Sequence, residues 1–251
     1  MKYRDFLKVD QVLRLIRDAV EQRKPFSLVR VGDGENLILA QNSVMPIKEV
    51  LSENWAKAAN QGKKGVTLPN IKLRNEMVKA LKKADVIGIP FWHGDPIIAE
   101  QRIKRPLTEA VFQYFKIRPK RTCHTFVNRV FTQKRRFWRI LKGRRIFLIG
   151  DWGESVKPIL QKEPYKLNIV FVQPFSNYEQ MEKVLKVAIQ RQHEFDIALV
   201  SCGVNAVVLT QKIAESTGKV AIDFGKSLMF MVQNKAGLEH SSHQSFRDML
   251  P

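Results

Sequence analysis

One stretch decides which fold the sequence predicts: Ser27-Leu28-Val29-Arg30-Val31-Gly32-Asp33-Gly34-Glu35-Asn36. The apolar run over 27–31 predicts a buried strand, and the Gly-Asp-Gly-Glu sequence that follows predicts a tight polar turn. Glycines on both sides of Asp33 let a ligand approach the backbone closely. A helix is expected over 36–40, so the stretch predicts a strand, a turn and a helix in succession.

Similar strand-like runs recur along the chain, at 86–90, 145–149, 168–172, 197–201 and 220–222. Segments with helical periodicity lie between most of them, at 75–83, 126–141, 178–191 and 206–216, and an amphipathic helix follows Asp10. This alternation predicts an α/β fold that is Rossmann-like, with a mostly parallel sheet and flanking helices. No linker or repeat interrupts it, so we expect a single domain over 1–251; the alternative is a boundary near 142–145.

The composition limits the class of protein. With 251 residues, 44% of them hydrophobic, the chain can bury a large core. Lys and Arg number 43 against 24 Asp and Glu, and the net charge of +19 predicts an anionic partner without identifying it. Cys123 and Cys202 have no paired spacing, which argues against a disulfide framework or a zinc site. Neither a signal peptide nor a membrane-spanning run is evident, so we expect a cytoplasmic location, with peripheral contact at the inner face of an anionic membrane as an option.

The turn after the first strand carries the sharpest chemical signal. Asp33 and Glu35 are one residue apart and can face the same ion, and carboxylate oxygens suit Mg²⁺ or Mn²⁺. Such an ion bridges diphosphate oxygens and offsets the charge of a departing nucleoside diphosphate. The structural alternative is a polar turn whose carboxylates stabilise the start of the next helix, and spacing alone favours it.

Other predicted strands also end in polar turns, and in an open parallel sheet such turns meet at one crevice. Ser201-Cys202-Gly203-Val204-Asn205 precedes a helix whose free N–H groups can hold a phosphate or a ribose. Gly150-Asp151-Trp152-Gly153-Glu154 offers two carboxylates and an indole for stacking; a capped helix with a packed Trp explains it equally well. The dinucleotide Gly pattern, the Gly-Lys-Ser/Thr phosphate loop and the Gly-x-Ser-x-Gly elbow are absent, which weakens dehydrogenase, ATPase and hydrolase interpretations.

Three of these segments, RVGDGE over 30–35, SCGVNAVVL over 201–209 and KVAIDFGK over 219–226, carry a family resemblance. Over residues 20–230 the chain resembles the bacterial glycosyltransferases of the GT-D fold, once grouped as a domain of unknown function and marked by an Asp-x-Glu metal motif. The resemblance implies a nucleotide-sugar donor, a UDP-sugar first of all, a Mn²⁺ or Mg²⁺ cofactor, and transfer to a cell-surface glycan or lipid-linked acceptor.

The resemblance also assigns residues. It places the metal on Asp33 and Glu35. The expected nucleotide-sugar contacts come from the same turns: Arg30, Gly32, Gly34, Gly203, Asn205, Asp223 and Lys226. Lys226 stands where the family commonly has a histidine, so a base or metal role at that position is in doubt, and a lysine there can contact phosphate.

An inverting transfer needs a base for the acceptor hydroxyl, and the turns offer carboxylates and one histidine: Asp95, Asp151, Glu154 and His93. For His93 a hydrogen-bonded loop residue is the favoured explanation. These candidates stay unranked.

The basic region over 116–145 is the second distinctive feature, because no acidic residue occurs between Glu109 and Asp151. A helix with a core-facing apolar side and a solvated basic side explains it most simply. Two alternatives to an active enzyme remain: a nucleic-acid or polyanion binding protein that uses this region, and an inactive family member that only binds nucleotide or glycan. No known nucleic-acid-binding signature is present, so specific nucleic acid is not expected as a partner.

Overall fold

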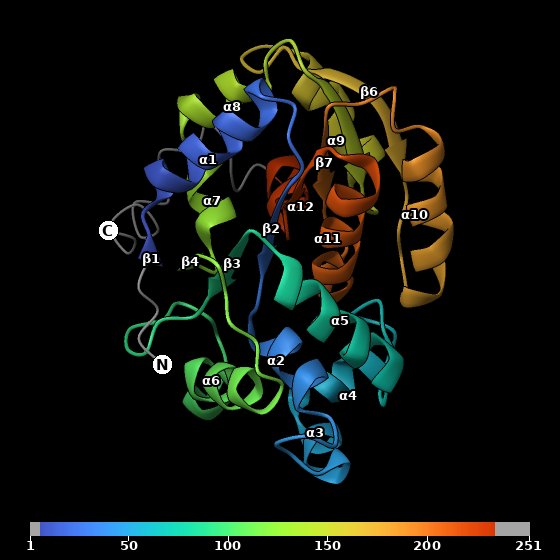
Figure 1. The fold of residues 1–251 in the computed structure, drawn as a ribbon. Coiled ribbons are helices and arrows are strands. Elements are labelled where there is room, and N and C mark those ends of the chain that lie inside the picture. The colour runs from blue at the N-terminus through green and yellow to red at the C-terminus, as the bar shows by residue number, and fades with distance from the viewer. Residues whose placement is uncertain (1–5, 234–251) are drawn as a thin grey trace.

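The chain folds around one all-parallel sheet. The structure is a computed structural model that describes residues 6–233. Its eight strands lie in the order β1-β4-β3-β2-β8-β7-β5-β6, and every pair of neighbours is parallel. Helices flank the sheet (Figure 1). The predicted α/β class and Rossmann-like parallel sheet are confirmed.

The strands are β1 (Phe6–Leu7), β2 (Phe26–Arg30), β3 (Val86–Ile89), β4 (Thr122–His124), β5 (Arg145–Ile149), β6 (Asn168–Gln173), β7 (Ile197–Val200) and β8 (Val220–Asp223). The helices are α1 (Val9–Glu21), α2 (Asp33–Ala40), α3 (Ile47–Ser52), α4 (Asn54–Asn60), α5 (Ile71–Lys83), α6 (Arg105–Tyr114), α7 (Val127–Phe131), α8 (Arg135–Leu141), α9 (Gly153–Gln161), α10 (Met181–Gln190), α11 (Ala206–Thr217) and α12 (Ser227–Val232). Short 3-10 turns cover Gln101–Ile103, Tyr178–Gln180 and Gly203–Asn205.

The sheet has a hydrophobic layer on each face. Alternate residues of each strand enter opposite layers, as Leu28 and Val29 of β2 do. One layer is completed by α2, α4, α5, α6, α10 and α11, and the other by α1, α7, α8, α9 and α12. Burial on both faces explains why the strands read as continuous apolar runs.

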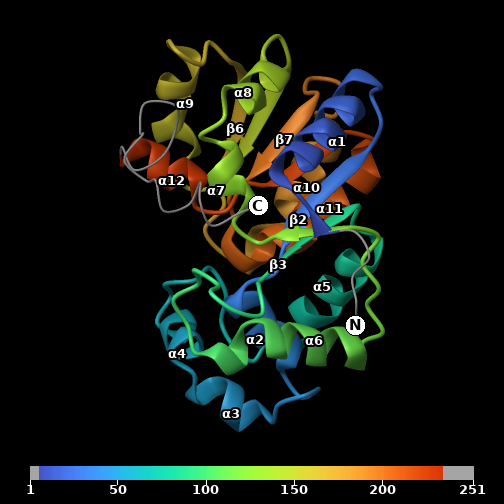
Figure 2. The same cartoon turned by 90° about the vertical axis from the view of Figure 1, so that its left-hand side faces the viewer.

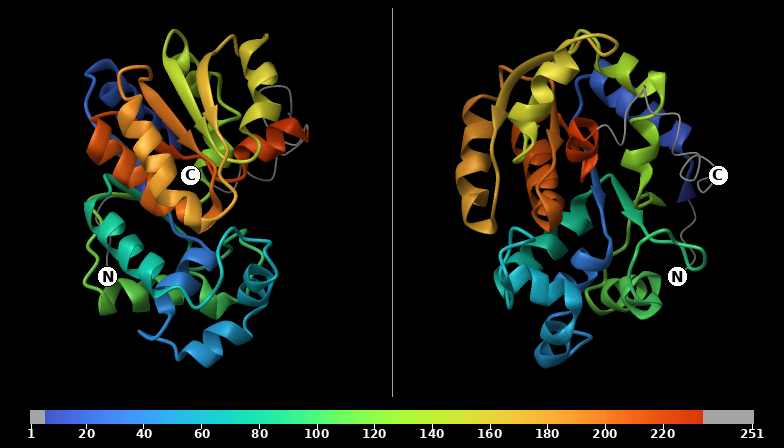
Figure 3. Two further views of the ribbon diagram at one scale, coloured as in Figure 1. Left: turned by 90° about the vertical axis from the view of Figure 1, so that its right-hand side faces the viewer. Right: turned by 180° about the vertical axis from the view of Figure 1, so that it is seen from behind.

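The carboxyl ends of the strands lead into a second tier of the molecule. Helices α2, α3, α4 and α6 gather beyond the ends of β2 and β3, below the sheet in Figures 1 and 2. After β2 the chain enters α2, which packs in one hydrophobic layer. After the neighbouring strand β8 it enters α12, which packs in the other hydrophobic layer (Figure 3). Ligands of open parallel sheets bind at such a switch point.

Several local predictions are wrong. The helix expected over 126–141 is two helices, interrupted at Lys134, whose backbone is extended (φ −100°, ψ 122°); the Trp138 indole N–H donates to the Thr132 carbonyl oxygen at 2.7 Å across the break. The helix expected over 36–40 begins at Asp33 instead. Strands β1 and β4 were not anticipated, since two or three residues form no recognisable apolar run.

Strands from before and after residues 142–145, the alternative domain boundary, belong to the same sheet. The expectation of a single domain over 1–251 stays a prediction. Within the described part of the chain, no helix has both the length and the apolar character that crossing a membrane requires.

Candidate functional site

The two carboxylates of the Asp-Gly-Glu turn lie in the first turn of α2, directly after β2. The positive end of the helix dipole favours them there. The Gly32 N–H donates to Glu35 Oε2 at 2.8 Å, which satisfies one of the unpaired N–H groups at the helix start. Stabilisation of the helix start therefore accounts for one carboxylate oxygen of Glu35. Asp33 is partly exposed and accepts no such hydrogen bond from the N–H groups at the helix start.

Gly34 lets a tryptophan approach the turn. A Cβ atom at this position would lie 2.6 Å from two ring carbons of Trp55, which comes from α4. Ile97, in the loop after β3, lies 3.9 Å from the Cβ position of Gly32, an ordinary van der Waals distance. The turn is thus held between the second tier of helices and the loop that follows β3.

Glu35 is poised to change its charge near neutral pH. Burial raises the pKa of its carboxyl from 4.5 to about 7; the neighbouring Asp223 carboxylate raises this pKa further, and the Arg30 guanidinium opposes the shift. A divalent cation at this carboxylate would displace the bound proton.

Arg30 and Asp223 form a buried ion pair across β2 and β8. Arg30 Nη2 lies 2.8 Å from Asp223 Oδ1, and Nη1 donates to the Thr125 carbonyl oxygen at 3.1 Å. Gly225 makes room for the guanidinium: with φ 53°, it would place a Cβ atom 2.2 Å from Arg30 Nη2. Burial raises the pKa of Asp223, and Arg30 counteracts that rise. Both residues, predicted as nucleotide-sugar contacts, thus have a structural partner in each other.

Two cations from separate segments act electrostatically on Asp33, and a third acts on one of them. Arg129 of α7 and Lys226 after β8 both feel the Asp33 charge, and Lys64 acts electrostatically on Lys226. Burial lowers the pKa of Arg129 to about 10, with a contribution from Arg30. The pKa of Lys226 is lowered by partial burial of its ammonium and then by the like charges of Lys64 and Arg129. Asp33 therefore lies within electrostatic range of two cations, Arg129 and Lys226.

The turn at Gly203 and Asn205 anchors the loop that carries Lys64. Asn205 Nδ2 donates to the Gly65 carbonyl oxygen at 2.9 Å, and the Tyr178 N–H donates to the same oxygen at 3.0 Å. The Lys64 carbonyl oxygen lies 3.6 Å from the Cβ position of Gly203. The predicted phosphate turn after β7 is thus covered by residues 62–65.

Comparison with known proteins places this arrangement in a family. The model of the GT-D fold-like domain matches residues 7–231. The chain belongs to the GT-D-like family. The resemblance predicted from the sequence is confirmed, and the family match covers nearly the whole described part of the chain.

Solved structures share the GT-D-like fold at low identity. One described as a new glycosyltransferase (DUF1792) from Streptococcus sanguinis is 14% identical with a TM-score of 0.58, over 96% of this chain and 91% of that one. Another, described as the highly conserved domain of unknown function 1792 with a distinct glycosyltransferase fold, is 16% identical with a TM-score of 0.55, over 97% and 93%. Likeness at this level shows the fold alone. No curated protein matches the chain.

The donor set of the GT-D-like chain fits a hard divalent cation. Within residues 6–233 no group of three or more His, Cys, Asp or Glu side chains forms a metal cage. Mg²⁺ needs no such cage, because it commonly uses one or two carboxylates and takes its other ligands from phosphate and water. Asp33 and Glu35 suit that role.

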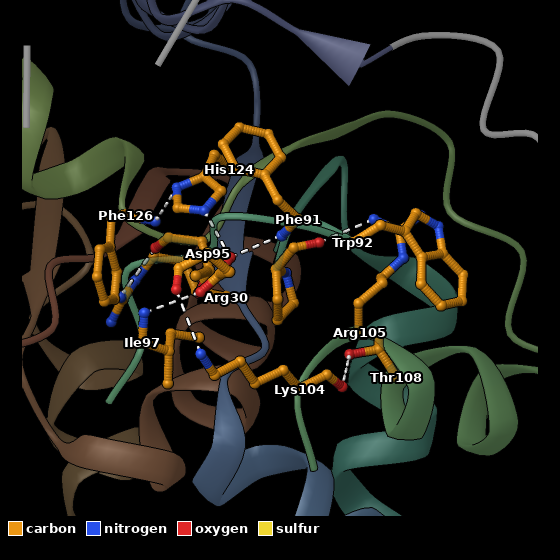
Figure 4. Close-up of polar contacts among 12 residues, drawn as sticks. Arg30, Phe91, Trp92, Asp95, Ile97, Lys104, Arg105, Thr108, His124 and Phe126 are labelled. Atoms are coloured by element: carbon orange, nitrogen blue, oxygen red, sulfur yellow. Dashed lines mark hydrogen bonds and ion pairs between the residues drawn. The ribbon is translucent and has the colours of Figure 1, made fainter. Parts of the chain in front are cut away.

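Asp95 is enclosed in a hydrogen-bond network (Figure 4). Its carboxylate accepts from the N–H groups of Phe91 at 2.6 Å and Ile97 at 2.9 Å, and from His124 Nε2 at 2.9 Å. Burial alone would raise the pKa of Asp95, but the hydrogen bonds outweigh burial and the pKa is lowered. His124 Nδ1 accepts from the Phe126 N–H at 3.1 Å, so both ring nitrogens are engaged. This network shapes the loop beside Gly32.

The other base candidates are exposed. Asp151 follows β5 and accepts a hydrogen bond from Ser176 Oγ at 3.0 Å, and Glu154 lies in the first turn of α9. Trp152, 37% exposed, presents part of its indole to solvent beside them. His93 is exposed on the loop after β3. The structure groups Asp151 and Glu154 at one strand end and keeps Asp95 with the turn of Gly32.

The basic side chains of the region over 116–145 lie in two places: some at the site and others at the opposite end of the sheet. Its apolar members on α7 and α8 are buried, as a core-facing helix requires: Val127, Val130, Phe131, Trp138 and Leu141. Arg135 and Arg139 of α8 are exposed. Helix α8 lies next to α1 in Figure 1. Arg129 instead reaches the site, where its guanidinium lies 3.6 Å from the Phe126 ring centre.

Sequence reasoning missed Lys64 and Arg129. Arg129 counted only as one charge in a basic run, and Lys64 was not considered. The one available signal for Lys64 was the pair of glycines around a double lysine in Gly62-Lys63-Lys64-Gly65, since glycines at both ends permit a tight loop.

Proposed function

We propose that the chain is a glycosyltransferase that moves a sugar from a nucleoside-diphosphate sugar, a UDP-sugar first of all, to a glycan or lipid-linked acceptor. The observation that carries the proposal is the position of Asp33 and Glu35. They lie after β2 at the switch point of the sheet, and Arg129 and Lys226 lie within electrostatic range of Asp33. A diphosphate and a divalent cation together would complement both signs of charge at this place.

Asp33 and Glu35 would hold the cation, which we propose to be Mn²⁺ or Mg²⁺. When bound, it would supply charge stabilisation to the departing diphosphate. Glu35 contributes a carboxylate that ionises near neutral pH, and the Arg30 guanidinium opposes the rise that burial causes in the pKa of the neighbouring Asp223. The glycines of the turn let phosphate oxygens come close to the backbone.

Asp151 and Glu154 are the better candidates for a base, because their carboxylates face solvent. Asp95 already accepts three hydrogen bonds. The exposed indole of Trp152 would offer a stacking surface for a base or a sugar. We further propose a cytoplasmic protein whose exposed basic residues on α8 bring it to an anionic membrane carrying the acceptor.

A donor-turnover assay tests the proposal. The full chain is incubated with a panel of nucleotide sugars and Mn²⁺, and nucleoside diphosphate release is measured for the wild type, Asp33→Asn and Glu35→Gln. We expect release with at least one donor, reduced about 100-fold or more in either variant, as for loss of a main electrostatic stabiliser. Asp10→Asn, in the first turn of α1, is the control and should keep full activity.

Each alternative function has its own outcome in this assay. Donor binding without turnover would identify an inactive family member. Failure to bind any donor, with salt-dependent binding of duplex DNA that is lost on neutralising Arg135 and Arg139, would replace the proposal with polyanion binding.

A further inference from the structure

The loop that follows β3 is closed by one carboxylate. Asp95 accepts hydrogen bonds from the N–H groups of Phe91 at 2.6 Å and Ile97 at 2.9 Å. Because both donors bind the same carboxylate, their nitrogen atoms lie within about 8 Å of each other. Ile97 lies 3.9 Å from the Cβ position of Gly32, the first residue of the Gly-Asp-Gly-Glu turn. Both ends of the loop are therefore held close to that turn.

Trp92 comes next in this loop and is fixed on one side. The Gln101 side-chain amide donates to the Trp92 carbonyl oxygen at 2.7 Å. The Arg105 guanidinium lies 5.5 Å from the centre of the Trp92 ring (Figure 4), and it also donates to the Pro90 carbonyl oxygen at 2.9 Å. Such a cation–π contact orients the ring without covering it, and Trp92 stays 46% exposed. The protein thus engages one side of the indole, and much of the remainder faces solvent.

The segment that contacts Trp92, residues 101–105, has little uncompensated charge. Its two arginines are paired with carboxylates: Arg102 with Glu53 at 2.5 Å and Glu100 at 2.8 Å, and Arg105 with Glu109 at 2.8 Å. Lys104 between them is buried and donates to the Asp95 carbonyl oxygen at 3.2 Å. The net charge of +19 is therefore offset at this loop, which has little attraction for an anionic polymer or an anionic bilayer.

A neutral sugar matches these surroundings. The C–H face of a sugar ring is apolar and can pack on an aromatic face, whereas the hydroxyl groups at its edge need hydrogen-bond partners. The loop offers both, because exposed polar side chains accompany the indole: His93, Glu100 and Gln101. An indole that is already oriented also loses little conformational entropy when a ligand binds.

We infer that Trp92 is the stacking platform of a subsite for a neutral sugar unit of the acceptor. The assignment to the acceptor rests on the proposed function. In Figure 4 the Trp92 ring and Ile97 lie on opposite sides of Asp95, and Ile97 is the residue that contacts the turn. The subsite therefore holds a sugar unit next to the reacting one, and it selects the acceptor without contacting the donor.

The test uses the full chain labelled with fluorotryptophan. The chain has four tryptophans, so fluorine NMR gives one resonance for each, and Trp92→Phe identifies that of Trp92. Methyl glycosides of glucose, galactose, mannose and N-acetylglucosamine are titrated with and without UDP and Mn²⁺, and glycerol is the control solute. We expect at least one glycoside to shift the Trp92 resonance saturably. The resonance of Trp138, which is buried, should not move.

Saturation-transfer NMR of the same glycoside compares the affinities of variants. Trp92→Ala should weaken binding about fivefold or more, because the stacking face is lost, whereas Trp92→Phe keeps an aromatic ring and should retain most of the affinity. Tyr114→Ala is the matched control: Tyr114, at the end of α6, is an aromatic residue that is 56% exposed, and its loss should change the affinity less than about twofold. Melting temperatures of all variants report on folding.

The subsite is overturned if no glycoside shifts the Trp92 resonance more than glycerol does, or if Trp92→Ala and Tyr114→Ala behave alike. A bilayer replaces the sugar as partner if phosphatidylglycerol vesicles, and no glycoside, shift this resonance and Ile98→Ala weakens vesicle binding, since Ile98 is fully exposed on the same loop. Lack of donor turnover together with Trp92-dependent glycoside binding would instead refute the proposed glycosyl transfer and leave the subsite.

Discussion

Replacing Glu35 by Gln should stabilise the protein at alkaline pH and leave it unchanged in acid. Gln keeps the shape of the side chain and an oxygen for the Gly32 N–H, which donates to Glu35 Oε2 at 2.8 Å. What it removes is the ability to ionise in a place where burial and the Asp223 carboxylate disfavour a negative charge.

The magnitude follows from the pKa of Glu35, which is 4.5 ordinarily and about 7 in the folded chain. Because a shift of one pKa unit corresponds to about 1.4 kcal/mol, the full difference in free energy of unfolding between Glu35→Gln and the wild type is about 3 kcal/mol. The folded-state pKa is raised, so the favourable contribution is complete below pH 4.5 and is lost as the pH rises through 7. The free energy of unfolding of the wild type should therefore drop below that of Glu35→Gln as the pH rises from 5 to 8.

Urea unfolding at pH 5, 6, 7 and 8, in EDTA so that no cation offsets the charge, gives the difference in free energy of unfolding directly. Glu154→Gln, an exposed carboxylate in the first turn of α9, is the control and should change the free energy by less than about 0.5 kcal/mol at every pH. A Glu35→Gln difference that is the same at pH 5 and pH 8, or a wild type that is the more stable at pH 8, would refute the reasoning.

Two further substitutions test the framework of the site. Gly225→Ala should lower the free energy of unfolding by about 3 kcal/mol, because the methyl group displaces Arg30 from Asp223. Gly218→Ala is the control: Gly218 has φ 69° but nothing within 4 Å of its Cβ position, so the loss should be about 1 kcal/mol. Equal losses in urea unfolding would show that the ion pair tolerates the methyl group. Asp95→Asn should lower the free energy of unfolding by about 2 kcal/mol at neutral pH, because an amide cannot accept from Phe91, Ile97 and His124 together. Because the pKa of Asp95 is lowered by folding, this deficit should shrink as the pH falls below about 4; an Asn variant of wild-type stability without turnover would point to a catalytic base instead.

The parallel sheet could be predicted because burial on both faces leaves a continuous apolar run in each long strand, as in Arg145–Ile149. The position of Asp33 and Glu35 at its carboxyl edge followed from that alternation. Strand β4, only Thr122–His124, gave no such run and was missed. The break after Phe131 was missed because the apolar positions keep a helical period on both sides of it, and periodicity does not register the Trp138–Thr132 contact that spans it.

The position of Lys64 could not be predicted, for a different reason. It depends on a hydrogen bond between Asn205 and Gly65, which are 140 residues apart in sequence. Arg30 and Asp223 were expected near the ligand, but their pairing across 193 residues also requires the strand order. Residues that lie on one strand end can be inferred from the pattern; contacts between strand ends depend on tertiary packing.

The pairing of β2 with β8 has a consequence for how the protein is made. β2 holds residues 26–30, and its partner on one side, Val220–Asp223, is synthesised much later, since Arg30 and Asp223 are 193 residues apart. Until then that edge of β2 has no neighbour, so the nascent chain carries an open apolar strand in its centre, a state prone to aggregation and suited to chaperone binding. Emergence of β8, rather than emergence of the Asp-Gly-Glu turn, is the step at which the Arg30–Asp223 pair can form during synthesis.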